Sequence, residues 1–157
     1  MPSAEDGPAV SRLIAECPPL DPNSAYCNLL QCTHFAESCV VAERDGRLLG
    51  WLSAYRPPAA PDEIFVWQVA VHGAARGQGL GQRLINTLLS RPVSRGATRL
   101  TTTITGDNGA SWALFTAFAR GHDARIDRRP MFDRDAHFAG RHETEHLVSI
   151  APINAGH

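Results

Sequence analysis

Three glycines at alternate positions, Gly77, Gly79 and Gly81, directly follow Arg76 and form the most chemically suggestive stretch of the chain. They come after an apolar run of strand-forming residues and before apolar residues that recur at helical spacing. Such a turn exposes backbone amides with no side chains in front of them, at the positive end of a helix dipole. The expected ligand is a phosphate or pyrophosphate group.

Two common phosphate loops do not fit this turn. The Walker A loop needs a lysine after its last glycine, and the 157 residues contain none, since all fifteen basic side chains are arginine. The dinucleotide fingerprint Gly-x-Gly-x-x-Gly fails because Gln82 stands where its last glycine should be. The pattern that fits is Arg/Gln-x-x-Gly-x-Gly/Ala, filled by Arg76, Gly79 and Gly81. It resembles the pyrophosphate loop of the GNAT superfamily of N-acetyltransferases.

That resemblance implies acetyl-CoA as co-substrate, and no metal. The backbone of the strand before the turn would bind the pantetheine arm as an added strand does. Asn108 is compatible with a helix N-cap as well as with a cofactor contact. The expected cofactor-binding residues are Val69, Ala70, Val71, Arg76, Gly77, Gln78, Gly79, Leu80, Gly81, Asn108 and Ser111.

One position departs from the family pattern. Many members carry, seven residues after the asparagine, a tyrosine that protonates the departing thiolate, and Phe115 stands there in this chain. The acid is therefore absent or comes from elsewhere. A simple thiol has a pKa near roughly 8.5, so a thiolate can leave without a strong acid.

Composition indicates one soluble globular domain spanning residues 1–157. Apolar residues make up 43% of the chain, and the net charge is −1, so there is no basic stripe for nucleic acid. No apolar stretch approaches the length of a membrane span. The four cysteines have neither C-x-x-C spacing nor a small secreted frame, so we expect reduced thiols and a cytoplasmic location.

Apolar periodicity and turn residues predict an α/β fold. The expected helices are Glu5 to Cys17, Asn23 or Ser24 to Phe35, Gly79 to about Ser90, and Asn108 to Ala119. The expected strands are Ser38 to Glu43, Arg47 to Tyr55, Glu63 to Val71, Arg99 to Ile104, and Glu143 to Ile150. Residues from Gly121 to Gly140 are predicted to be irregular. The order resembles the GNAT fold, a mixed, mostly antiparallel sheet flanked by helices, with its first strand apparently missing and its central strands parting near Val71.

The segment His142 to His146, HETEH, matches the zinc-protease pattern H-E-x-x-H. That pattern works on a helix, where positions i and i+4 lie about 6 Å apart along the axis. On a strand the two histidines are roughly 13 Å apart and cannot share a metal ion. The residues that follow, Leu147 to Ile150, are strand-like, which disfavours the hydrolase hypothesis.

Five further segments extend the resemblance within the superfamily: LDPNSAYCNLLQCTHF, SCVVAE, PDEIFVWQVAVH, ARGQGLG and TTTITGDNGAS. They are similar to the branch that acetylates the γ-amine of 2,4-diaminobutyrate by direct attack, in ectoine biosynthesis, as a homodimer. This small substrate carries two ammonium groups and one carboxylate, so acids are expected in its site. An alkyl ammonium is unreactive until a base or a water relay removes a proton.

The candidate substrate-binding residues are Asp21, Tyr26, Trp67 and Glu143, and the candidate catalytic residues are Glu63, Trp67 and Gln68. Each of the substrate-binding candidates also has a structural interpretation: a turn former, two core aromatics and a surface carboxylate. Glu63 is a candidate base because it shares a strand face with Phe65, Trp67 and Val69, although the family's base glutamate aligns nearer Phe65. Arg128 or Arg129 are candidates for the substrate carboxylate.

Two other classes of function stay open. The chain would also fit an acetyltransferase for another amine, such as an aminoglycoside or a protein N-terminus. The missing tyrosine is compatible with a non-catalytic acyl-CoA-binding module.

Overall fold

The computed structural model describes residues 1–155 and contains one six-stranded sheet with the order β1-β2-β3-β4-β6-β5. Only the β3–β4 pair is parallel, and the other neighbours are antiparallel. The strands are β1 Val40–Arg44, β2 Arg47–Tyr55, β3 Glu63–Val71, β4 Arg99–Thr105, β5 Arg125–Phe132 and β6 Glu145–Ala151. The α-helices are α1 Gly7–Ala15, α2 Ala25–Thr33, α3 Leu80–Leu89 and α4 Gly109–Gly121. Short 3-10 turns are η1 Ala4–Asp6, η2 Ala36–Ser38, η3 Gly73–Ala75 and η4 Pro92–Ser94.

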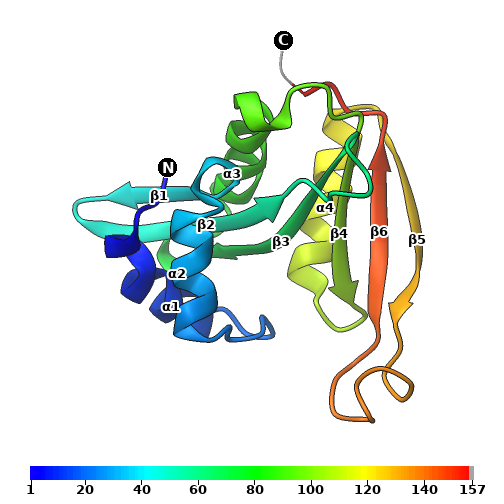
Figure 1. The fold of residues 1–157 in the computed structure, drawn as a ribbon, viewed down its shortest axis with the longest axis horizontal. Helices are drawn as coiled ribbons and strands as arrows, with labels where there is room; N and C mark the ends of the chain where they lie inside the picture. The colour runs from blue at the N-terminus through cyan, green and yellow to red at the C-terminus, as the bar shows by residue number, and fades with distance from the viewer. Residues whose placement is uncertain (156–157) are drawn as a thin grey trace.

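The helices cover the sheet in two pairs. In Figure 1, α1 and α2 lie over one face of β2 and β3, and α3 and α4 lie behind the sheet. Two separate apolar cores correspond to these faces. Trp51 and Ala70 pack with α1 residues and Cys32 of α2, whereas the larger core joins α3 and α4 to the opposite face.

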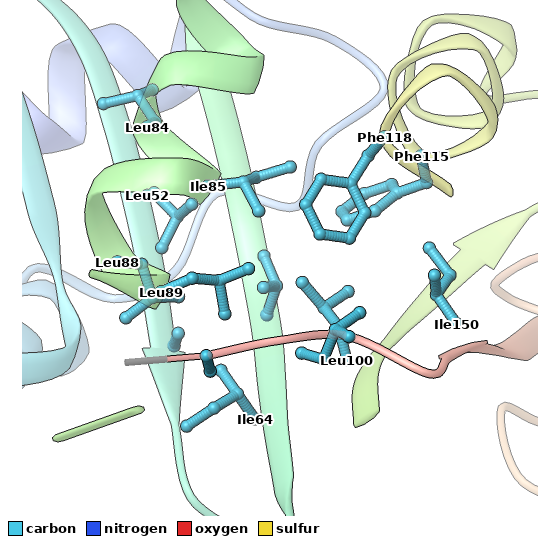
Figure 2. Close-up of a cluster of buried hydrophobic side chains, with 14 of the residues drawn as sticks. Leu52, Ile64, Leu84, Ile85, Leu88, Leu89, Leu100, Phe115, Phe118 and Ile150 are labelled. Carbon is cyan, nitrogen blue, oxygen red and sulfur yellow. The ribbon is translucent and has the colours of Figure 1, made fainter. Parts of the chain in front are cut away.

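The larger core fixes the two helices whose starts form the cofactor site. Figure 2 shows Leu84, Ile85, Leu88 and Leu89 of α3 beside Phe115 and Phe118 of α4, above side chains from the strands. Their i, i+4 spacing on α3 and i, i+3 spacing on α4 place them on one face of each helix. Each fully buried side chain of this size contributes about 1.5–3 kcal/mol, so packing holds both helix N-termini in place.

The central strands separate earlier than the sequence indicated. β3 and β4 pair only from Glu63 with Arg99 to Val66 with Thr102, so they part after Val66 and not near Val71. A β-bulge at Trp67 accompanies the separation, because Ser53 pairs with Gln68 while the next residue of β2 pairs with Val66. An extra residue of this kind bends a strand and disrupts its ladder.

The bulge also corrects the expected strand face. Trp67 lies with Phe65 on the Tyr55 side of the sheet, with ring centroids 6.3 Å and 5.2 Å from that of Tyr55. Val69 faces the other way and packs against the larger core. The expectation that these residues share one face with Val69 was therefore wrong, because a bulge reverses the alternation at a position that periodicity cannot reveal.

The segment predicted to be irregular after Gly121 contains a strand, β5. Seven of its eight residues are exposed, and it pairs only with β6, so it has no apolar alternation to reveal it. β5 and β6 form an antiparallel hairpin, so β6 has a neighbour on both sides and β5 is the edge strand.

Most other elements agree with the sequence within two residues. β2 and β3 have the predicted bounds, and the Asp45–Gly46 hairpin has positive φ at both residues. β1 begins at Val40, two residues later than predicted, because Ser38 belongs to a 3-10 turn. Among residues 1–155 no strand precedes β1. None of the helices in this part of the chain is long and apolar enough to cross a membrane.

Candidate active site

The glycine turn has the backbone geometry that an anion site requires. Gly77 and Gly79 both have φ of 72°, a left-handed conformation that side chains with a Cβ disfavour, and Gly79 is the N-cap of α3. Gly81 has a different role, because a Cβ there would stand 3.0 Å from Leu114 Cδ1. It lets α3 approach α4 closely.

Side chains within the turn hold its shape. Arg83 Nη1 donates to the carbonyl of Gln78 at 2.7 Å, and Gln78 Nε2 donates to the carbonyl of Ala74 at 3.0 Å. Arg76 Nε donates to the carbonyl of Val71 at 3.2 Å. The first-turn N–H groups of α3 have no partner within the helix, so they are available to an anion.

A cavity of about 460 Å³ lies beside this turn. Of the predicted cofactor residues, it is lined by Val69, Val71, Arg76, Gly77, Gly79, Leu80, Gly81, Asn108 and Ser111. Ala70 and Gln78 do not line it: Ala70 is buried against α1, and the Gln78 side chain turns back to Ala74. The other wall comes from Cys17, Pro18, Pro19 and Leu20, which the sequence did not indicate.

On the side that faces this cavity, the backbone of β3 has no neighbouring strand, although the Val71 carbonyl accepts from Arg76 Nε and Cys17 Sγ. His72 N donates to Leu49 O of β2, so by the alternation of an antiparallel pair the amides of Val69 and Val71 point away from β2. β4 has already separated from β3 at this level. An extended amide-containing chain therefore finds unpaired strand groups here. Together with the glycine turn, this fits the pantetheine arm and pyrophosphate of coenzyme A.

The loop between α1 and α2 is tied to β3 by one side chain. Gln68 Nε2 donates to the carbonyl of Asp21 at 2.8 Å, and Gln68 Oε1 accepts from Asn23 Nδ2 at 2.8 Å. Asn23 also donates to Asn28, which donates to Ser11. Both ends of the Gln68 amide are therefore used to position the loop, which favours positioning over direct contact with the reacting amine.

A second, polar cavity of about 350 Å³ adjoins the first and shares Pro19 with it. It lies where the α1–α2 loop, the end of β4 and the β5–β6 loop meet, and both long loops lie in the lower part of the view in Figure 1. It is lined by Pro19, Asp21, Thr105, Asp107, Arg134, Gly140, Arg141, His142 and Glu143. The structure thus brings Asp21 and Glu143 together in one cavity, far apart as they are in the chain.

Two charged residues of this cavity, Asp21 and His142, form a cluster with Glu145, which does not itself line the cavity. His142 Nε2 lies 3.2 Å from Asp21 Oδ2 and 3.8 Å from Glu145 Oε1. Glu145 is on β6 with its side chain only 20% exposed, and its Oε2 is buried with no hydrogen-bond partner. Burial raises the pKa of Glu145. A buried carboxylate oxygen without a donor is suited to an ammonium group or to a proton.

His142 favours its charged form in this setting. Its pKa is raised first by the 2.6 Å hydrogen bond between His142 Nδ1 and the Glu143 carbonyl, and then by the charges of Asp21 and Glu145. Because the folded-state pKa is the higher one, the charged imidazole stabilises the fold below about pH 6.5. That contribution is lost as the pH rises through the raised pKa.

The sequence missed His142 and Glu145 as site residues. Both lie in the HETEH segment, whose pattern in the sequence matches only a zinc motif. His142 precedes β6 and His146 lies within it, so the two histidines are not on a helix. Residues 1–155 contain no group of three or more potential metal ligands. The alternation of side chains along a strand would have placed Glu145 on the same face as Glu143. Nothing in the sequence, however, indicated that Glu145 is the more buried of the two.

Several predicted residues lie outside both cavities. Glu63 pairs with Arg99 at 3.5 Å and lines neither cavity. Tyr26 is 70% exposed and Trp67 is 42% exposed, which corrects their alternative interpretation as core residues. Glu143 lines the cavity but is exposed and pairs with Arg134.

The remaining candidates are placed as follows. Arg128 stacks over the ring of Trp112, and Arg129 is exposed on β5, so neither reaches the polar cavity. Phe115 is buried in the core and supplies no proton donor. Asn108 caps α4 by accepting from Ser111 N at 3.1 Å, and both residues also line the cofactor cavity.

A sheet that splays beside a glycine turn at a helix N-terminus defines an acyl-CoA-dependent transferase fold. The sequence profile of the Acetyltransferase (GNAT) family matches residues 8–119. The chain therefore belongs to the GNAT family of acetyltransferases.

Individual relatives are more specific. The L-2,4-diaminobutyric acid acetyltransferase of Methylotuvimicrobium alcaliphilum is 53% identical over 154 residues, covering 98% of this chain and 90% of that protein. The protein of the same name from Vibrio cholerae is 46% identical over 149 residues, covering 95% and 86%. A solved structure of the diaminobutyrate acetyltransferase EctA from Paenibacillus lautus, in complex with L-2,4-diaminobutyric acid and coenzyme A, superposes with a TM-score of 0.92 at 34% identity, covering 96% and 92%.

Proposed function

We propose that this protein transfers the acetyl group of acetyl-CoA to the γ-amine of L-2,4-diaminobutyrate, giving N4-acetyl-2,4-diaminobutyrate. The observation that carries the proposal is the pair of adjoining cavities, one suited to coenzyme A and one lined by acids. The names of the close relatives, and the ligands in the Paenibacillus lautus structure, support the same substrates. A role in ectoine biosynthesis stays a prediction.

Coenzyme A would be bound mainly by backbone groups. The pyrophosphate would lie on the amides at the start of α3, with Arg76 nearby, and the pantetheine arm would run along Val69 and Val71. Two glycines with positive φ keep the turn open to an anion. The mostly apolar walls, including Leu80 and Leu114, suit the arm between these two ends.

Acetyl transfer requires one proton to leave the γ-ammonium. We assign this role to Glu145, because its Oε1 lies 3.8 Å from Nε2 of the cavity residue His142 and its raised pKa makes it a stronger base than a solvated carboxylate. The neutral amine then attacks the acetyl carbonyl carbon. The C–N bond forms as the C–S bond breaks, and the nitrogen loses a second proton to solvent as the amide forms. Coenzyme A leaves as the thiolate and takes up a proton from solvent, because no donor stands at Phe115.

Regioselectivity must come from the polar cavity. The α-amine has a pKa near roughly 8 and the γ-amine near roughly 10, so free solution favours acetylation of the α-amine at neutral pH. The cavity must therefore hold the α-ammonium away from the thioester. Asp21 suits this role because its backbone is fixed by Gln68 and its carboxylate faces the cavity beside His142.

A thiol-release assay would test the proposal. Purified protein with acetyl-CoA should release thiol fastest with L-2,4-diaminobutyrate, and more slowly with 2,3-diaminopropionate, ornithine and a peptide with a free N-terminus. NMR of the product should show acetylation at the γ-nitrogen. Faster thiol release with another amine would make that amine the substrate in place of diaminobutyrate. Binding of coenzyme A without thiol release for any amine would indicate a non-catalytic module.

A homodimer and a cytoplasmic location complete the proposal. Large apolar side chains are exposed on α2 and β3, including Tyr26, Leu29 and Trp67, and a second copy of this chain would cover such a surface. The cysteines are free, in keeping with a reducing compartment. Sedimentation velocity over a concentration series should give the mass of two chains, and a single-chain mass at all concentrations would refute the dimer.

A further inference from the structure

The polar cavity contains more positive charge than an ammonium site needs. Besides Asp21, Asp107 and Glu143, it is lined by Arg134 and Arg141, both from the β5–β6 loop. A site that recognised only amines would be weakened by two guanidinium groups. The acceptor proposed above has a carboxylate on the same carbon as its α-ammonium, so an acid and a cation must act in the same cavity.

The two arginines differ in their partners. Arg134 Nη1 lies 3.4 Å from Glu143 Oε1, so its charge is largely balanced. The His142 charge is balanced between Asp21 and Glu145. Within residues 1–155, no ion pair or side-chain hydrogen bond involves the guanidinium of Arg141, an exposed residue that lines the cavity.

The loop holds the Arg141 backbone in a defined position. Gly140 N donates to Arg134 O at 2.8 Å, and Arg141 N donates to Phe138 O at 3.0 Å. Ala139 has φ of 52°, an uncommon conformation for a residue with a Cβ. Such strain persists only where surrounding contacts enforce it, and it is found frequently at ligand-binding loops.

We infer that Arg141 binds the α-carboxylate of the acceptor, and that the β5–β6 loop thereby selects diamino acids over simple diamines. The inference rests on the proposed function. A planar guanidinium can form two parallel hydrogen bonds to a carboxylate, which a lysine cannot reproduce. Asp21 on the opposite loop would hold the α-ammonium, so the two loops together would orient the substrate and leave its γ-amine for the thioester.

The test compares two acceptors that differ only in the carboxylate. 1,3-Diaminopropane is L-2,4-diaminobutyrate without that group. In Arg141→Gln the KM for diaminobutyrate should rise roughly 10- to 100-fold, the effect of losing charge-assisted hydrogen bonds. The KM for diaminopropane should stay unchanged or fall, because a cation near a dication is removed. The KM of Arg141→Lys for diaminobutyrate should lie between those of wild type and Arg141→Gln. Its KM for diaminopropane should not be raised.

Arg129→Gln is the matched control, because Arg129 is exposed on β5 and lines neither cavity. It should leave both acceptors unaffected. If an acceptor binds but reacts slowly, its inhibition constant is measured in place of its KM. If Arg141→Gln does not fold, Arg141→Lys takes its place in the comparison. An unchanged diaminobutyrate KM in the Arg141 variants, or an equal loss on both acceptors, would overturn the inference.

The same experiment separates this inference from the proposed function. If the wild-type protein acetylates neither compound, the proposed function fails and the inference fails with it. If the wild type acetylates both equally well, the protein is a diamine acetyltransferase that does not recognise the carboxylate. In that case the inference alone is wrong.

Discussion

The two cavities of this protein are built in opposite ways. The cofactor cavity takes half of its lining from one continuous stretch, from the end of β3 through the glycine turn to the first turn of α3, and the rest from the start of α4 and from Cys17 to Leu20. The polar cavity takes its residues from three loops that are distant in sequence, after α1, after β4 and after β5. The first can be recognised as a motif, whereas the second exists only after the chain has folded.

The cavities also differ in the groups that they present. The cofactor side offers mainly backbone amides, apolar walls and one cation. The acceptor side offers charged side chains whose positions depend on hydrogen bonds from neighbours such as Gln68. Substitutions on the two sides should therefore alter different kinetic constants, and this separation can be tested.

The largest effect is expected at Glu145. Glu145→Gln should lower kcat/KM for diaminobutyrate about 10²- to 10⁴-fold, the usual contribution of a general base, with little change in the acetyl-CoA KM. Burial raises the pKa of Glu145, so charged Glu145 opposes folding above its unfolded-state pKa, and this cost is relieved as the pH falls. The variant should therefore be at least as stable as wild type at pH 7, as measured by thermal unfolding.

Glu143→Gln is the control for this substitution. Glu143 is two residues away but exposed and paired with Arg134, and its loss should change kcat/KM far less. The wild-type pH–rate profile should also have an acidic limb above the usual glutamate range, absent from Glu145→Gln. Equal losses in the two variants would mean that the cavity acts only through its total charge.

The next largest effect tests the cofactor side. In Gly79→Val a β-branched side chain must adopt φ of 72° in the turn, so coenzyme A affinity should fall on the order of 100-fold. Gly73→Ala is the matched control, because a Cβ there meets nothing within 4 Å and its φ is not left-handed. Calorimetry measures both. Unchanged affinity in Gly79→Val would remove the pyrophosphate from this turn.

The sequence predicts the cofactor cavity much better than the polar cavity, for the same reason that only the first contains a continuous motif. Local patterns predicted β2 and β3 with their bounds and both helices at the cofactor cavity. They missed β5, because its exposed residues do not alternate, and the bulge at Trp67, because one inserted residue is invisible to periodicity. Glu145 was missed because its burial depends on the packing of β4, β5 and the loops around it.

A smaller effect is expected at Asp21. Asp21→Asn keeps the shape and removes the charge, so the diaminobutyrate KM should rise about tenfold, the value of one charge-assisted contact at a partly exposed site. The acetyl-CoA KM should stay constant, and some α-acetylated product should form. An NMR titration should also show a lower pKa for His142, because the Asp21 charge helps to raise it. Pure γ-product with wild-type kinetics would assign the selectivity to other residues of the cavity.

The smallest effect is expected at Arg76, where the two kinds of site meet. Arg76 is an exposed side chain in a cavity that otherwise binds through its backbone, and its Nε occupies the Val71 carbonyl at 3.2 Å. Arg76→Ala removes a cation near the pyrophosphate but also frees a strand group that the pantetheine arm would use. The two effects oppose each other, so coenzyme A affinity should fall only about two- to fivefold, within the range of an exposed charge. The loss should shrink at high salt because screening weakens the wild-type contact. Calorimetry at two salt concentrations would check this, and a loss larger than that of Gly79→Val would show that side-chain charge dominates the cofactor cavity too.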